Sequence, residues 1–323
     1  PLNQETRNTY AYFGMPVYEY SLRQGIQDGF LAPYRVHRVI STVDAAGWRP
    51  SVGEMDRFGN PIPDAEYHTK DYERALAFKA RTAAFARHLF NFMKRTDRFA
   101  KTLVFCVDQE HADEMRRVLG NLNADLMRQY PDYVCRVTAD EGENGRGHLG
   151  RFQDVETDTP VILTTSQLLT TGVDAPTIKN VALARVIGSM VEFKQVIGRG
   201  TRVRDDYGKM FFNILDYTGS ATQLFANPTF DGDPVITSVD EIDADGITIA
   251  SEIEQEDTQD EGDDPRFVSD HDAGEGQATP VGVNDSAIRH RKVYFDGGSV
   301  EILAHIVHEL DADVNDPAFA LAM

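Results

Sequence analysis

The sequence has no apolar run long enough to cross a membrane, and it contains few cysteines. No stretch approaches the roughly 20 consecutive apolar residues that a transmembrane helix needs, although 41% of the 323 residues are hydrophobic. Cys106 and Cys135 lie in apolar runs typical of strands, so we expect reduced core residues rather than a disulfide. The two cysteines and nine histidines match no zinc-ligand spacing. These absences predict a cytoplasmic protein without membrane contact or a metal centre.

The usual sequence marks of a complete nucleotide site are also missing. No Gly-Lys-Ser/Thr phosphate loop is present, because Gly208-Lys209 is followed by Met210. Four Asp-Glu pairs exist, but the first two do not directly follow an apolar strand and the last two come too late in the chain to be a Walker B box. The N-terminus, Pro1-Leu2-Asn3-Gln4, has neither an initiator methionine nor a signal pattern. We therefore expect a piece of a longer protein.

Charge of one sign is concentrated in one region. Residues 231–285 hold 18 Asp and Glu against the single Arg266, so most of the formal net charge of -20 resides there. Such a stretch buries too little apolar surface to offset the entropy of the chain, which predicts a disordered linker. The rest of the chain is nearly neutral, so a local basic track for phosphates remains possible.

Apolar runs of strand length alternate with helical patterns over most of the chain. Such alternation predicts an α/β fold with a parallel sheet, whose ligands are expected at the carboxyl ends of the strands. A long helix is expected over Lys70–Arg95, a glycine-rich loop over Asp140–Gly150, and His111 is expected to be solvated. The expected strands are Tyr34–Ser41, Lys101–Val107, Tyr133–Thr138, Pro160–Thr165, Val181–Ile187 and Lys209–Leu215.

Arginine, glycine and glutamine are combined in one short stretch, Gln195-Val196-Ile197-Gly198-Arg199-Gly200-Thr201-Arg202. On a helix expected over Ser189–Thr201, Arg199 and Arg202 point the same way, with Gln195 one turn upstream. A guanidinium can bind two phosphate oxygens at once, and glycines allow close approach. The stretch predicts a polyphosphate site, and an exposed basic helix end is the alternative.

A second stretch, Thr170-Thr171-Gly172-Val173-Asp174-Ala175-Pro176, lies some twenty residues upstream. In this order and at this spacing, the two stretches resemble motifs V and VI of superfamily 2 helicases and translocases. The resemblance implies that three residues are catalytic: Gln195, Arg199 and Arg202. It implies that these three, with Gly172 and Asp174, contact ATP bound to a neighbouring RecA-like domain. It also implies that Thr165, Thr170 and Thr171 contact DNA.

Other segments resemble a narrower family. The run from Thr9 to Tyr34, which includes Tyr12-Phe13-Gly14, resembles the segment after motif III in the restriction (R) subunit of type I restriction-modification enzymes. Asp108-Gln109-Glu110-His111-Ala112 resembles the same family. The likeness extends from Thr9 to about Asp233 and returns weakly at Lys292–Leu310. It implies an ATP-driven double-stranded DNA translocase that uses ATP with Mg²⁺ and works with methyltransferase (M) and specificity (S) subunits.

This resemblance implies a division of the chain. Residues 1–70 are expected to connect to a first motor domain, 71–225 to form the second RecA-like, helicase C-terminal domain, 226–291 to be the acidic linker, and 292–323 to begin a truncated domain with a strand–turn–helix. Because the phosphate loop and Walker B box belong to the first motor domain, the fragment alone is expected to be inactive. Two alternatives are another superfamily 2 DNA or RNA helicase and a non-catalytic nucleic-acid-binding scaffold.

Overall fold

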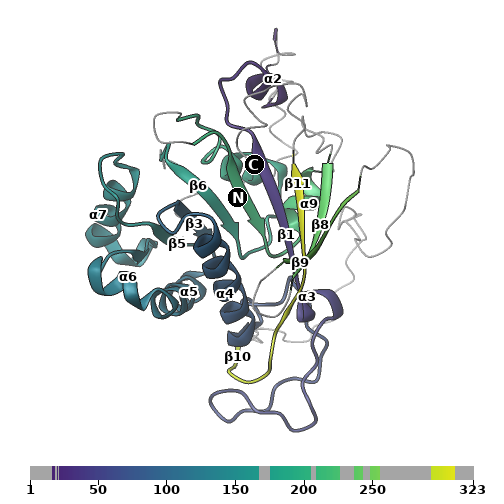
Figure 1. The fold of residues 1–323 in the computed structure, drawn as a ribbon. Coiled ribbons are helices and arrows are strands. Elements are labelled where there is room, and N and C mark those ends of the chain that lie inside the picture. The colour runs from purple at the N-terminus through teal and green to yellow at the C-terminus, as the bar shows by residue number, and fades with distance from the viewer. Residues whose placement is uncertain are drawn as a thin grey trace, which may run out of the picture.

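A nine-stranded sheet forms the centre of the molecule in the computed structural model (Figure 1). The structure describes residues 17–18, 20, 22–166, 175–204, 209–225, 236–242, 248–254 and 292–309. The strand order is β4-β5-β3-β6-β7-β1-β11-β8-β9. The first six strands in this order are parallel, and the last three join with antiparallel pairing. The nine strands are β1 (Tyr34–Ser41), β3 (Lys101–Phe105), β4 (Val134–Arg136), β5 (Ile162–Thr165), β6 (Ile178–Leu183), β7 (Phe212–Asp216), β8 (Ile236–Ile242), β9 (Thr248–Glu254) and β11 (Ile302–Glu309).

Helices cover both faces of the parallel strands, as continuous apolar strands require. On one face, α8 (Met190–Ile197), α9 (Ser220–Phe225) and α7 (Gly142–Gln153) contribute to a core that includes Leu103, Leu163 and Leu183. On the other face, α4 (Lys79–Arg95), α5 (Gln109–Leu122) and α6 (Ala124–Gln129) cover Val104, Ile162 and Ala182. The expected α/β class is confirmed: the protein is mixed α/β with a mostly parallel central sheet. No helix among the described residues is long and apolar enough to span a membrane.

A smaller cluster adjoins the carboxyl end of β1. Here β2 (Leu76–Phe78) pairs with β10 (Val293–Phe295), and Trp48 lies against the Phe295 ring. The short helix α3 (Thr42–Ala46), which follows β1, is tied to α4 by a buried ion pair of 2.9 Å between Arg81 and Asp44. The cluster therefore joins segments that are more than 200 residues apart in the sequence.

Several expected elements differ in their bounds or type. The helix expected from Lys70 begins at Lys79, because residues 71–75 turn and Glu73 adopts a positive φ of 64°. The expected loop over Asp140–Gly150 is a short 3-10 helix, η2 (Ala139–Glu141), followed by α7. The helix expected after Gly298 is instead the strand β11, which pairs with β1.

The borders of the expected domains do not coincide with the edges of the sheet. The strand β1 lies within the span expected to be a connector, and β8 and β9 lie within the expected linker, yet all three belong to the central sheet. The acidic stretch after Glu254 lies outside the described residues. The division of the chain into domains stays a prediction.

Candidate functional site

The helix that carries Gln195 is shorter than expected. Ser189 caps α8, its hydroxyl accepting from the backbone N–H of Glu192, and the buried side chains Phe193, Val196 and Ile197 hold the helix on the sheet. The helix ends at Ile197, and residues 198–200 turn, with the Gly200 N–H donating to Ile197 O at 2.8 Å. Gln195 is exposed on the last turn. The expectation of a helix through Thr201 is therefore wrong, and Arg199 and Arg202 lie in the segment that follows the helix.

That segment is held at the amino ends of β1 and β7. Arg202 forms a bridge with Leu31, and the Ala32 N–H donates to Thr201 O at 2.7 Å. Both partners precede β1, so the pairing places the arginines where that strand begins. Arg199 is half-buried and Arg202 is exposed. The backbone of this segment is thus held in place at Thr201 and Arg202. The exposed side chain of Arg202 can present its charge to a ligand outside the sheet.

A buried lysine that the sequence reasoning did not assign lies at the same edge. Lys209 has no exposed surface, and its Nζ donates to Pro176 O at 2.8 Å. Burial, and then the charges of Arg202 and Lys179, lower the pKa of Lys209 to about 7. The surroundings of Lys209 thus disfavour its positive charge, and the lysine ties the start of β7 to Pro176 at the end of the expected motif V. Lys209 is the lysine of the dismissed phosphate-loop look-alike Gly208-Lys209, and no local pattern predicts its contact with Pro176.

Thr165 lies at the opposite edge, where β5 ends. Its Oγ1 is buried and has no hydrogen-bond partner among the described residues. The neighbouring parallel strands β3 and β6 end at the same edge, since the Cys106 N–H donates to Thr165 O and the Ala184 N–H to Phe105 O. The other expected site residues, Thr170, Thr171, Gly172 and Asp174, lie outside the described residues.

The candidate residues therefore form two groups separated by the length of the strands. Thr165 lies at the carboxyl end of its strand, where ligands were expected, whereas Arg199 and Arg202 lie near strand amino ends, because α8 returns from the end of β6 to the start of β7. Among the described residues, no group of three or more His, Cys, Asp or Glu is arranged to hold a metal ion. The expected solvation of His111 is also wrong: burial lowers its pKa to about 3, and its Nδ1 accepts from the Val107 N–H.

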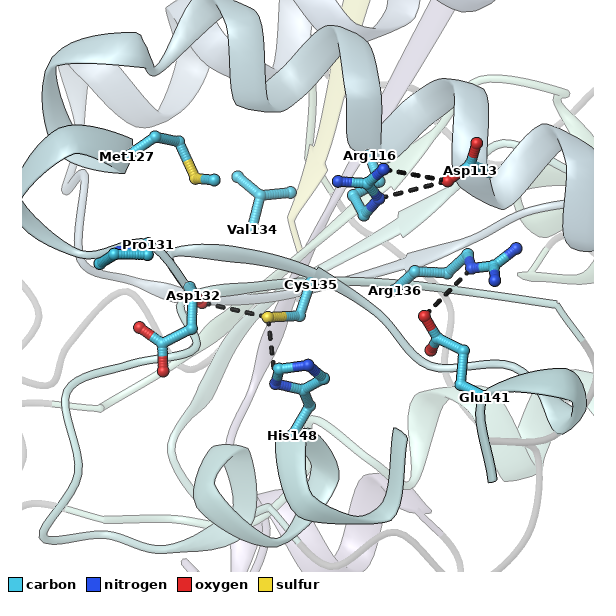
Figure 2. A pocket seen from close by; sticks show the side chains of 10 residues that line it. All are labelled: Asp113, Arg116, Met127, Pro131, Asp132, Val134, Cys135, Arg136, Glu141 and His148. Atoms are coloured by element: carbon cyan, nitrogen blue, oxygen red, sulfur yellow. Dashed lines mark hydrogen bonds and ion pairs between the residues drawn. The ribbon is translucent and has the colours of Figure 1, made fainter. Parts of the chain in front are cut away.

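A cavity of about 530 Å³ between α5, β4 and α7 contains Cys135 and His148 (Figure 2). The cysteine Sγ lies 3.3 Å from His148 Nδ1 and 3.3 Å from Asp132 O. Burial raises the pKa of Cys135 to about 12, so the thiol is protonated and unsuited to nucleophilic chemistry. Figure 2 shows Arg116 and Arg136 paired with Asp113 and Glu141. Both cysteines are free and buried, as expected from the sequence.

Comparisons with known proteins find that the chain is similar to endonuclease subunits of type I restriction enzymes. It is 43% identical over 310 residues to the type I restriction enzyme EcoAI endonuclease subunit of Escherichia coli, covering 94% of this chain and 38% of that protein. It is 33% identical over 226 residues to the EcoKI endonuclease subunit of Escherichia coli strain K12, covering 65% of this chain and 19% of that protein. The chain thus spans well under half the length of these relatives.

A solved structure agrees with the sequence relatives. It is a fragment assigned to an HsdR subunit of a type I restriction enzyme from Vibrio vulnificus YJ016, which matches with a TM-score of 0.59 and 68% identity. The match covers 72% of this chain and 40% of that one. No family model matches the sequence.

Proposed function

Since the chain is homologous to the endonuclease subunits of type I restriction enzymes, we propose that it is the second motor domain of an ATP-dependent double-stranded DNA translocase in such a subunit. The observation that carries this proposal is the placement of Arg199 and Arg202 in one segment held at the amino edge of the sheet. Two arginines on a segment with a fixed backbone suit a polyphosphate presented by another domain.

The proposed chemistry is phosphoryl transfer at a boundary between two domains. ATP with Mg²⁺ is held mainly by the first motor domain, and the described residues fit only the outer part of the nucleotide: they offer cations and no cluster of acids for the metal. The guanidinium groups of Arg199 and Arg202 donate to γ-phosphate oxygens and stabilise the charge that develops there. Gln195, exposed on the last turn of α8, orients the site, and Gly172 and Asp174 complete the contacts with the nucleotide.

The proposed DNA contacts lie at the other edge of the sheet. Thr165, together with Thr170 and Thr171, contacts the DNA backbone, and opening and closing of the domains moves these contacts along the duplex. Phosphate contacts of this kind carry no sequence information. Recognition therefore belongs to partner subunits, the methyltransferase and specificity subunits of the cytoplasmic complex.

The first prediction concerns Arg199 in the full-length subunit, assembled with its partners on DNA. Arg199→Ala should lower ATP turnover strongly, because arginine fingers in phosphoryl transfer contribute about 10³–10⁵ in rate. Arg199→Lys should restore only part of the rate, since an ammonium lacks the planar fork. ATP affinity should change much less than turnover if the group acts on the transition state. Steady-state ATP hydrolysis, with a thermal melt of each variant, measures this.

Two controls accompany that measurement. The 323-residue chain alone should hydrolyse no ATP, because it contains no phosphate loop. Arg128, at the end of the distant helix α6, serves as a matched control, and Arg128→Ala should leave turnover unchanged. Wild-type turnover by a normally folded Arg199→Ala variant would show that this segment is not part of the active site.

A further inference from the structure

Arg185 is a buried cation just beyond the end of β6. Its side chain is 8% exposed, and its Nη2 forms an ion pair with Glu192 on the first turn of α8. Arg185 lies in a bend two residues beyond Leu183, the last residue of β6, and its guanidinium reaches the first turn of α8. Arg185 therefore lies at the carboxyl edge, on the same side of the sheet as α8.

The guanidinium of Arg185 has hydrogen-bonding capacity that the protein does not use. Its Nε is buried and has no hydrogen-bond partner among the described residues, whereas Nη2 is occupied by the carboxylate of Glu192. Burial, and then the nearby charge of Arg74, lower the pKa of Arg185, so its surroundings already disfavour the positive charge. Buried polar groups are normally hydrogen-bonded. A buried guanidinium whose Nε donor is unused is therefore suited to receive a further anion.

A second unsatisfied group lies near it. Thr165 continues the face of Leu163, whereas the adjacent Thr164 faces α5 and donates to Ala112 O at 2.9 Å. The Thr165 hydroxyl thus lies on the same side of the sheet as Arg185, with only β3 between their strands. The hydroxyl and the guanidinium are both hydrogen-bond donors. Two unused donors at one edge indicate a ligand rich in oxygen acceptors.

From this arrangement we propose that Arg185 binds a backbone phosphate of DNA and that its ion pair with Glu192 links this contact to α8. The inference deepens the proposed function and rests on it. ATP is the less suitable anion, because Arg199 and Arg202, the residues proposed to contact it, lie at the amino edge of the sheet. An arginine fork binds two phosphate oxygens at once, which matches a phosphodiester.

The link to α8 follows from the position of Glu192. This residue lies three positions before Gln195 on the same helix, and α8 leads directly to Arg199. A phosphate that binds Arg185 competes with Glu192 for the same guanidinium. DNA contact at one edge of the sheet therefore changes the anchoring of the helix that leads to the other edge. Arg185 is a DNA-binding residue in this account, and Glu192 is a positioning residue.

The test uses two variants that break the same ion pair in opposite ways. The full-length subunit is titrated with a 30-base-pair duplex lacking a recognition sequence, at several salt concentrations. Arg185→Gln should weaken binding and reduce the slope of log affinity against log salt by about one, because one phosphate contact is lost. Glu192→Gln keeps the cation, so its salt slope should equal that of the wild type and its affinity should be equal or higher.

Opposite results in this pair would overturn the inference. If Arg185 only holds α8 in place, both variants lose the same tether and should bind DNA alike, with unchanged salt slopes. Should Arg185→Gln fail to fold, Arg185→Lys replaces it: Lys should keep the slope but weaken binding, and wild-type affinity would contradict the proposal. Arg199→Ala, assayed for ATP turnover in parallel, tests the proposed function separately, since that variant keeps both residues of the pair.

Discussion

Gly200 separates Arg199 from Thr201 and lies directly against the ring of Phe212. A Cβ at this position would meet the Phe212 ring at 2.2 Å, far inside normal contact. Phe212 is fully buried where β7 begins, so it has little room to move. The sequence suggested that glycine here allows a ligand to approach, but the structure shows that the close neighbour is a core side chain. Packing against Phe212 therefore requires glycine at position 200, between Arg199 and Arg202.

The prediction at the scale of single residues concerns this contact. Gly200→Ala should reduce the free energy of unfolding by about 1–3 kcal/mol, the usual cost of overpacking a core. Gly147→Ala in α7 is the matched control, because nothing lies within 4 Å of the added Cβ; it should stabilise the protein by roughly 0.5–1 kcal/mol. Urea unfolding measures both. Equal stability of Gly200→Ala and the wild type would show that the contact with Phe212 is relaxed in solution.

At the scale of helices and strands, the sequence predicted those elements whose formation depends on neighbouring residues. The apolar runs at β3 and β5 and the Asp108 cap of α5 appear where the sequence placed them. The strand β2 was missed and β11 was expected to be a helix, because their strand partners are distant in the sequence. The glycines before Leu149 suggested a loop, yet α7 already begins at Gly142 and is anchored by the buried Phe152. Elements that depend on pairing with a distant strand, or on one anchoring side chain, show no periodic pattern in their own residues and could not be predicted from them.

Three buried histidines join β11 to β1 and α4. His37 Nδ1 lies 2.8 Å from His305 Nε2, and His88 Nδ1 lies 3.0 Å from the Tyr217 hydroxyl. Burial, and then the neighbouring His37, lower the pKa of His88 to about 3. Burial, and then the neighbouring His88, lower the pKa of His305 to about 3 as well. These two rings are therefore neutral in the folded state at neutral pH.

The prediction for this cluster is a loss of stability in mild acid. Unfolded histidine has a pKa near 6.5, so between pH 6.5 and 3 the unfolded chain binds protons that the folded state excludes. Stability is fully present above pH 6.5 and should fall by about 1.4 kcal/mol per pH unit for each histidine as the pH drops. His88→Gln should make this dependence shallower, whereas His68→Gln, at a half-exposed site, should not. Urea unfolding measures the free energy of unfolding at each pH from 5 to 8. A free energy that does not change over this range would contradict buried, neutral histidines.

At the scale of the whole molecule, two sets of candidate residues lie at opposite edges of the central sheet. The arginines follow α8 to the amino edge, whereas Thr165 and Arg185 end parallel strands at the carboxyl edge. The sequence placed the two motifs in order along the chain but not at opposite ends of the strands. That separation depends on the path of α8 back across the sheet, which no motif spacing contains. Under the proposed function, DNA and ATP are therefore contacted at opposite edges of the sheet.

ATP turnover of the full-length, assembled subunit, measured as a function of DNA concentration, tests this separation most directly. Arg199→Ala should lower the plateau rate by a factor of at least about 10³ and leave the half-saturating DNA concentration unchanged. Thr165→Val, which replaces a hydroxyl that has no hydrogen-bond partner in the described structure, should raise the half-saturating concentration and keep the plateau. A wild-type plateau for Arg199→Ala, or a shift of the DNA dependence in that variant alone, would contradict the account.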